Sequence, residues 1–143
     1  MAVTIITRWE STQMEPMLEW RMWKQMRDAF RIKRFIFTPI MPEMNKIAIE
    51  QYATMEEALA VAQDDGEFCF LEPLGKKLVN EIPKESEGDV VLILGNTPQD
   101  NLALADEEQT YRIETHARYG HLYGINAAAI AMAMRFAPDG TDR

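Results

Sequence analysis

Hydrophobic residues along this chain occur either in short unbroken runs or at intervals of three to four positions. The short runs are rich in β-branched and aromatic residues and predict strands at 2–7, 34–40, 67–73, 89–96 and 110–115. The run at 89–96 is continuous in valine, leucine and isoleucine. This pattern is typical of a central parallel strand that is covered on both faces.

A long helical pattern follows the first predicted strand and opens at Pro16. Its predicted packing face consists of apolar residues at helical spacing: Met14, Leu18, Met22, Met26, Ala29 and Phe30. Basic side chains fall on the opposite arc, namely Arg21, Lys24, Arg27 and Arg31. We therefore expect a helix that packs through one face and presents positive charge on the other.

Two further helices are predicted. The stretch "TMEEALAVAQDDG" has Thr54 as its N-cap, Glu57 completing a capping box and Gly66 as its terminator. The last helix runs from about 127 to 136 and is built mainly of alanine and methionine, with Asn126 as the predicted N-cap. Small side chains would let this helix lie close to the sheet, although alanine is also the best helix former in any context.

Strands that alternate with helices predict an α/β fold with a mostly parallel sheet of five to six strands and helices on both faces. A length of 143 residues suits one domain. We expect that domain to span residues 1–137, and we expect the short polar segment 138–143, which is rich in turn formers, to be a flexible tail.

Composition limits the partners and the compartment. The net charge of −8 disfavours non-specific binding of polyanions, but residues 19–35 carry six basic side chains and two acidic ones. The single cysteine, Cys69, excludes an intramolecular disulfide. The chain shows neither a secretion signal nor an apolar stretch long enough to cross a membrane. We therefore expect a cytoplasmic protein that does not contact membranes.

Three loops follow the last three predicted strands: "EPLGKK", "GNTPQDN" and "THARYGHLYGIN". In parallel α/β sheets, ligands bind outside the carboxyl ends of the strands. Gly75, Gly95 and Gly124 let the backbone of these loops turn sharply or approach a ligand closely. The sequence therefore predicts one pocket that is framed by all three loops.

The order of "VVLILGN", "YRIET" and "YGINAAAIAMAMRF" resembles the carboxyl-terminal half of the SPOUT family of knotted, S-adenosylmethionine-dependent RNA methyltransferases. The resemblance covers about residues 67–136, with Gly95, Ile113 and Asn126 at matching positions and "EPLG" where the family often has a Glu-Pro pair. It implies bound S-adenosylmethionine, a carboxyl-terminal trefoil knot and a homodimer. The cofactor-binding residues that it implies are Glu72, Pro73, Gly75, Leu94, Gly95, Asn96, Ile113, Thr115, Gly124, Ile125 and Asn126.

The chain also departs from the family pattern. After Gly95 and Asn96 the family often has a glutamate and a second glycine, whereas this chain has "TPQDN", and Gly124 stands where serine is common. The 2′-O-methylating branch places an asparagine and an arginine after the first strand, and no clear copy of that pair is present. Arg8 is the candidate catalytic residue, with Arg21 as an alternative.

Other candidate side chains keep two interpretations each. His116 and His121 lie in the last loop and could act as general bases, but they lack a third partner for a metal. Trp20 and Trp23 could stack on nucleic-acid bases or shield the edge of the first helix from solvent.

Two functions therefore remain open. The first is an S-adenosylmethionine-dependent RNA methyltransferase whose RNA substrate contacts the basic first helix. The second is a module with the same fold that binds S-adenosylmethionine or another nucleotide without turnover, or that serves as an interaction module. A flavodoxin-like or Rossmann-like domain is disfavoured because "TRWESTQMEP", after the first strand, contains no glycine for a phosphate loop.

Overall fold

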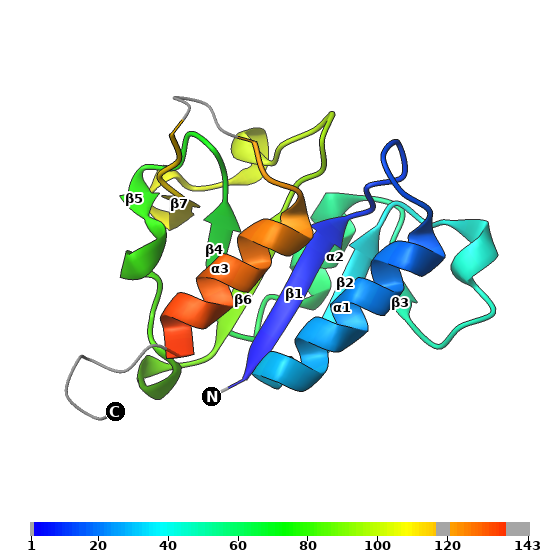
Figure 1. Cartoon of the computed structure of the whole chain (residues 1–143), viewed down its shortest axis with the longest axis horizontal. Helices are drawn as coiled ribbons and strands as arrows, with labels where there is room; N and C mark the ends of the chain where they lie inside the picture. The colour runs from blue at the N-terminus through cyan, green and yellow to red at the C-terminus, as the bar shows by residue number, and fades with distance from the viewer. Residues whose placement is uncertain (1, 117–120, 137–143) are drawn as a thin grey trace.

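A seven-stranded parallel sheet forms the centre of the computed structural model, which describes residues 2–116 and 121–136 (Figure 1). Its strands are β1 (Val3–Arg8), β2 (Arg34–Thr38), β3 (Glu50–Gln51), β4 (Glu67–Leu71), β5 (Lys77–Leu78), β6 (Val90–Leu94) and β7 (Thr110–Arg112). They lie in the order β3-β2-β1-β6-β4-β7-β5, and all neighbouring pairs are parallel. The predicted fold class is confirmed. Two of the strands, β3 and β5, were not predicted, because two residues leave no alternating pattern.

Strand β6 occupies the middle of the sheet. It pairs with β1 on one side and β4 on the other, and all five of its residues are buried. The prediction of a central strand at this position is therefore confirmed. Because β4, β6 and β7 lie close together, the segments that follow them meet at one edge of the sheet.

Helices α1 (Pro16–Phe30) and α3 (Gly124–Phe136) cover one face of the sheet, and α2 (Met55–Val61) covers the other (Figure 1). Helix α1 begins at Pro16 as predicted. Helix α2 has the predicted N-cap, since Thr54 Oγ1 accepts a hydrogen bond from Glu57 N at 3.2 Å. It ends earlier than expected, because its C-cap is Ala62 rather than a residue next to Gly66.

The packing face of α1 is rotated from the predicted one. Trp20, Trp23 and Met26 are buried, whereas Leu18 is 49% exposed. Large aromatic rings bury more apolar area than leucine or alanine, so they determine which side of the helix meets the sheet. The two tryptophans pack against Phe35, and burial excludes them from stacking on nucleic-acid bases.

Helix α3 begins at Gly124, so the prediction of Asn126 as its N-cap is wrong. The backbone N–H groups of Asn126 and Ala127 both donate to Tyr123 O, at 2.9 and 3.0 Å, and this starts the helical turn earlier. The expected close approach of small residues is confirmed. Ala128 and Ala131 are buried, and a Cβ added to Gly124 would lie 3.4 Å from Gly95 O and from Leu94 Cβ. The predicted tail 138–143 lies outside the described residues.

Candidate functional site

A cavity of about 390 Å³ lies at the carboxyl ends of β4, β6 and β7. Its walls come from the segments after β4 and β6, the end of β7 and the start of α3. The described lining residues are Leu71, Glu72, Pro73, Leu74, Leu94, Gly95, Asn96, Thr97, Pro98, Gln99, Asp100, Leu102, Tyr111, Ile113, His121, Leu122, Gly124 and Ala127. The prediction that the three late loops meet is therefore confirmed.

The turn after β4 is held against β7 by its backbone. Glu72 N donates to Tyr111 O at 2.9 Å, and Gly75 N donates to Glu72 O at 3.0 Å. A Cβ at Gly75 would lie 2.4 Å from the backbone carbon of Tyr111. Only glycine permits this approach, so Gly75 shapes the cavity wall although it is not among the described residues that line it.

The loop after β6 forms a tight turn anchored on the segment after β1. Asn96 and Gln99 exchange backbone hydrogen bonds of 2.9 and 3.2 Å, and a Cβ on Gly95 would lie 2.4 Å from Gln99 O. Asn96 Nδ2 donates to Trp9 O at 2.9 Å, and Thr97 Oγ1 donates to a carboxylate oxygen of Glu10 at 2.7 Å. This loop is therefore preorganised by groups outside the cavity.

Glu72 places a buried carboxyl group in the cavity wall. It is 3% exposed, and its Oε1 accepts a hydrogen bond from Asn101 N at 2.9 Å. Burial raises the pKa of Glu72 to about 7, although the bond from Asn101 opposes the shift. This carboxyl group therefore exchanges its proton near neutral pH.

Arg8 is connected to Glu72 through Asn101. Arg8 Nε donates to Asn101 Oδ1 at 2.9 Å, and Asn101 N donates to Glu72 Oε1. Asn101 therefore joins the arginine to the carboxyl group, through its side chain on one side and its backbone on the other. Burial lowers the pKa of Arg8, while the charges of Glu56, Glu72 and Asp100 act in the opposite direction. The amide nitrogen Asn101 Nδ2 is buried without a hydrogen-bond partner within the described residues.

The predicted cofactor residues divide into two groups. Glu72, Pro73, Leu94, Gly95, Asn96, Ile113 and Gly124 line the cavity. Gly75, Thr115, Ile125 and Asn126 are not among its described lining residues. Asn126 is exposed on α3 and Ile125 is packed in the core. These roles remain predictions.

The sequence patterns single out neither the three leucines that line the cavity nor Asn101, which is not among its described lining residues. Leu74, Leu102 and Leu122 supply apolar wall, and Asn101 bonds both to Arg8 and to Glu72. The predicted pocket of three consecutive loops could have pointed to the leucines, but not to Asn101, whose partners are far away in sequence.

The two histidines differ in position. His121 lines the cavity, whereas His116 is exposed and is not a described lining residue. The described part of the chain brings no three histidine, cysteine, aspartate or glutamate side chains together as a metal site would require. Within residues 2–116 and 121–136, every helix is too short or too polar to cross a bilayer.

No protein-family model and no curated protein sequence matches the chain. Among solved structures, a candidate RNA methyltransferase from Bacillus anthracis has a TM-score of 0.68 and 18% identity, covering 93% of this chain and 91% of that one. An RNA 2′-O ribose methyltransferase has a TM-score of 0.69 and 14% identity, over 94% of this chain and 55% of that one. The chain has the SPOUT fold.

A third structure adds a ligand to the comparison. The SpoU methyltransferase AviRb from Streptomyces viridochromogenes, in complex with its cofactor AdoMet (S-adenosylmethionine), has a TM-score of 0.63 and 14% identity over 94% of this chain and 58% of that one. The chain thus spans nearly all of the Bacillus anthracis protein and little more than half of the other two. The SPOUT fold agrees with the resemblance noted in the sequence.

Proposed function

We propose that the chain is an S-adenosylmethionine-dependent RNA methyltransferase. The observation that carries the proposal is the cavity formed by the segments after β4, β6 and β7 on a SPOUT fold. The solved structures that share this fold over at least 93% of the chain include two described as RNA methyltransferases and a SpoU methyltransferase crystallised with AdoMet. The residues of this cavity supply the further support for the cofactor.

The charge of the cavity favours AdoMet over phosphate-bearing nucleotides. Among its described lining residues are two carboxyl side chains, Glu72 and Asp100, and no lysine or arginine. Phosphate groups need cationic or backbone donors, whereas the sulfonium of AdoMet is positively charged. Gly95 adds a backbone without a Cβ at the wall. These features fit an S-adenosyl ligand.

Seven residues would hold that cofactor by lining the cavity: Glu72, Pro73, Leu94, Gly95, Asn96, Ile113 and Gly124. For Gly75, Thr115, Ile125 and Asn126 the resemblance to the family is the support. When bound, AdoMet supplies an electrophilic methyl group. The chain has to hold the accepting RNA atom in line and keep its lone pair available.

Arg8 is our candidate for orienting that RNA atom. It ends β1 beside the cavity, and Asn101 fixes its Nε while the far end of the guanidinium retains further donors. An arginine in this position can donate hydrogen bonds to a ribose or base oxygen and stabilise negative charge that develops there.

We also propose a cytoplasmic homodimer that contains the trefoil knot, with RNA on the basic side chains of α1. Arg21, Arg27 and Arg31 are exposed and Lys24 is half-buried. Helix α1 and helix α2 cover opposite faces of the sheet (Figure 1). The charge of Glu56, at the start of α2, acts on Arg8, so Arg8 is nearer to α2 than the basic side chains of α1 are. A second copy could bring its own basic helix nearer to the cavity, which supports the dimer.

The buried free thiol of Cys69 is compatible with a reducing compartment.

One observation favours the alternative of a binding module without turnover. Glu56, Glu72 and Asp100 surround Arg8 with negative charge, and such a cavity mouth repels RNA phosphates. A module of this kind would bind AdoMet and transfer nothing.

The two proposals separate in one experiment. The protein is incubated with total RNA and AdoMet that carries a trideuterated methyl group, and the digested nucleosides are analysed by mass spectrometry. A trideuteromethyl nucleoside that disappears with the Arg8→Ala variant supports the enzyme. Calorimetric binding of AdoMet without any labelled nucleoside supports the binding module, and absence of AdoMet binding refutes both.

A further inference from the structure

The described lining residues of the cavity include two acidic side chains and no lysine or arginine to balance their charge. Glu72 lies in its wall and Asp100 lies at its exposed side. The charges of both acids act on Arg8, but Arg8 Nε donates its hydrogen bond to the neutral side-chain amide of Asn101. No ion pair joins Arg8 to either carboxyl group within residues 2–116 and 121–136. The charges of the two acids therefore act on whatever occupies the cavity.

Glu72 is the more effective of the two acids because it is shielded from water. It is 3% exposed, and within the described residues it accepts one hydrogen bond, from Asn101 N. Charge interactions are stronger where water is excluded than at an exposed loop position such as that of Asp100. A cation in the cavity would interact with the Glu72 carboxylate across little solvent.

We propose that the Glu72 carboxylate, assisted by Asp100, makes this cavity prefer an S-adenosyl ligand with a positively charged sulfur over the neutral thioether of the same shape. The inference rests on the proposed function and adds a determinant of ligand choice to it. In a methyltransferase this preference retains the methyl donor and releases the demethylated product, S-adenosylhomocysteine.

The two ligands form a matched pair. S-Adenosylmethionine and S-adenosylhomocysteine share their adenosine, amino and carboxylate groups, so the ratio of their dissociation constants isolates the methyl group and the charge at sulfur. A unit charge a few ångströms from a partly shielded carboxylate changes affinity by about tenfold or more.

The preference depends on pH through the proton on Glu72. The charged groups that act on Glu72 are Arg8 from β1 and Asp100 from the loop after β6, and the titratable side chains of Tyr111, from β7, and His121, before α3, line the same cavity. With a pKa of about 7, the carboxyl group ionises as pH rises through neutrality. The preference for the sulfonium ligand therefore rises between about pH 6 and about pH 8.

Isothermal titration calorimetry with both ligands, at these two pH values, tests the inference. The Glu72→Gln variant keeps an oxygen that can accept from Asn101 N but loses the charge. Its preference is expected to fall about tenfold and to lose most of its pH dependence, while its affinity for S-adenosylhomocysteine changes by less than about threefold. Glu57→Gln, which removes the same charge from an exposed site on α2, should leave the preference unchanged.

Three outcomes would overturn the inference, and a fourth would also overturn the proposed function. If Glu72→Gln retains the wild-type preference, or if the wild type binds both ligands equally, Glu72 does not select for charge. Should Glu72→Gln fail to fold, Asp100→Asn, on an exposed loop, is expected to lower the preference by about two- to threefold, and no change would refute the proposal. If the wild type binds neither ligand, the proposed function itself fails.

Discussion

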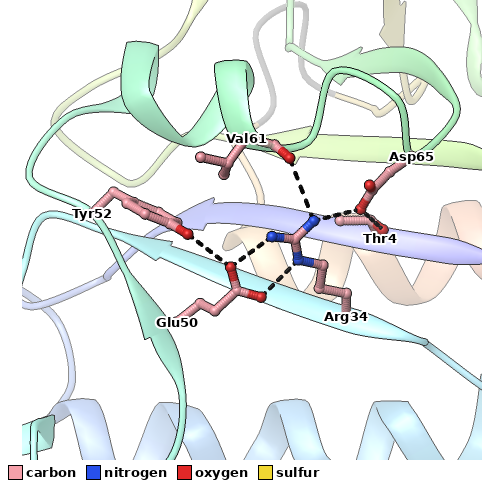
Figure 2. A network of polar contacts seen from close by, with 6 residues as sticks. All are labelled: Thr4, Arg34, Glu50, Tyr52, Val61 and Asp65. Atoms are coloured by element: carbon pink, nitrogen blue, oxygen red, sulfur yellow. Dashed lines mark hydrogen bonds and ion pairs between the residues drawn. The ribbon is translucent and has the colours of Figure 1, made fainter.

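The amino end and the carboxyl end of the sheet each hold an arginine, but the two arginines have different hydrogen-bond partners. At the amino end, Arg34 bonds both oxygens of Glu50, at 2.6 and 2.7 Å, and also reaches Asp65 at 3.0 Å (Figure 2). At the carboxyl end, Arg8 donates within the described residues one hydrogen bond, to the neutral amide of Asn101. The guanidinium of Arg34 is paired with carboxylates, whereas that of Arg8 keeps donors that can bind a ligand.

The carboxyl groups at the two ends differ in the same sense. Hydrogen bonding to Arg34 lowers the pKa of Glu50, and Tyr52 adds a further bond to it at 2.9 Å. Burial instead raises the pKa of Glu72 to about 7. The comparison indicates that the amino end is a closed structural clamp, whereas the carboxyl end keeps its polar groups free to meet a ligand.

The largest effect should follow from Arg8→Ala, which removes the available guanidinium. We expect methyl transfer to RNA to fall by about a hundredfold or more, equivalent to about 2.7 kcal/mol of transition-state stabilisation. The free energy of unfolding should change by less than about 1 kcal/mol, because Arg8 makes few bonds. Single-turnover kinetics and urea unfolding measure the two quantities. A variant that loses stability but keeps its rate would reverse the roles assigned to the two ends.

Arg34→Ala should have the opposite consequence. It leaves Glu50 and Asp65 without their cation, and we expect the free energy of unfolding to fall by about 2 kcal/mol. The dissociation constant of AdoMet should stay within about twofold of the wild type, since the network is at the far end of the sheet. Arg21→Ala, at an exposed position of α1, is the matched control and should cost less than about 0.5 kcal/mol. Equal losses in both variants would argue against a clamp.

The sequence predicts the carboxyl end of the sheet better than it predicts the amino end. The strand-loop order and the glycines locate the cavity because parallel strands all finish at one edge. The link from Arg8 through Asn101 to Glu72 spans 93 and 29 residues and has no local signature. The Arg34 network is equally invisible, since it joins four separate segments (Figure 2).

Helix α1 illustrates a different limit. Its length and its first residue follow from spacing and Pro16, but its packing face depends on side-chain volume in the folded core. Glu19 is buried although it is charged, and its carboxylate accepts from Glu10 N at 2.8 Å and from Trp23 Nε1 at 3.0 Å. Periodicity places Trp23 one helical turn after Glu19, but it cannot anticipate the burial, because Glu10 N, which lies outside the helix, is identified as a partner only once the chain has folded.

The smallest effect concerns the pH dependence of stability, and it separates the two ends by sign. In the unfolded chain Glu72 has a pKa of 4.5, and in the folded protein about 7, so the folded state binds more protons between these values. The stability that Glu72 contributes is present below pH 4.5 and is lost as pH rises through about 7. Glu50, whose pKa is lowered, contributes stability that is lost as pH falls.

Urea unfolding of the wild type and of Glu72→Gln at about pH 5 and about pH 8 tests this sign. Relative to the variant, the wild type should lose about 1 to 2 kcal/mol over that interval. Groups common to both proteins, such as Glu19 and Glu50, cancel in the difference. A difference that stays constant with pH would show that the Glu72 carboxyl is solvated in the folded protein. The carboxyl end would then be as fully satisfied as the amino end, by water in place of an arginine, and the contrast between the two ends would disappear.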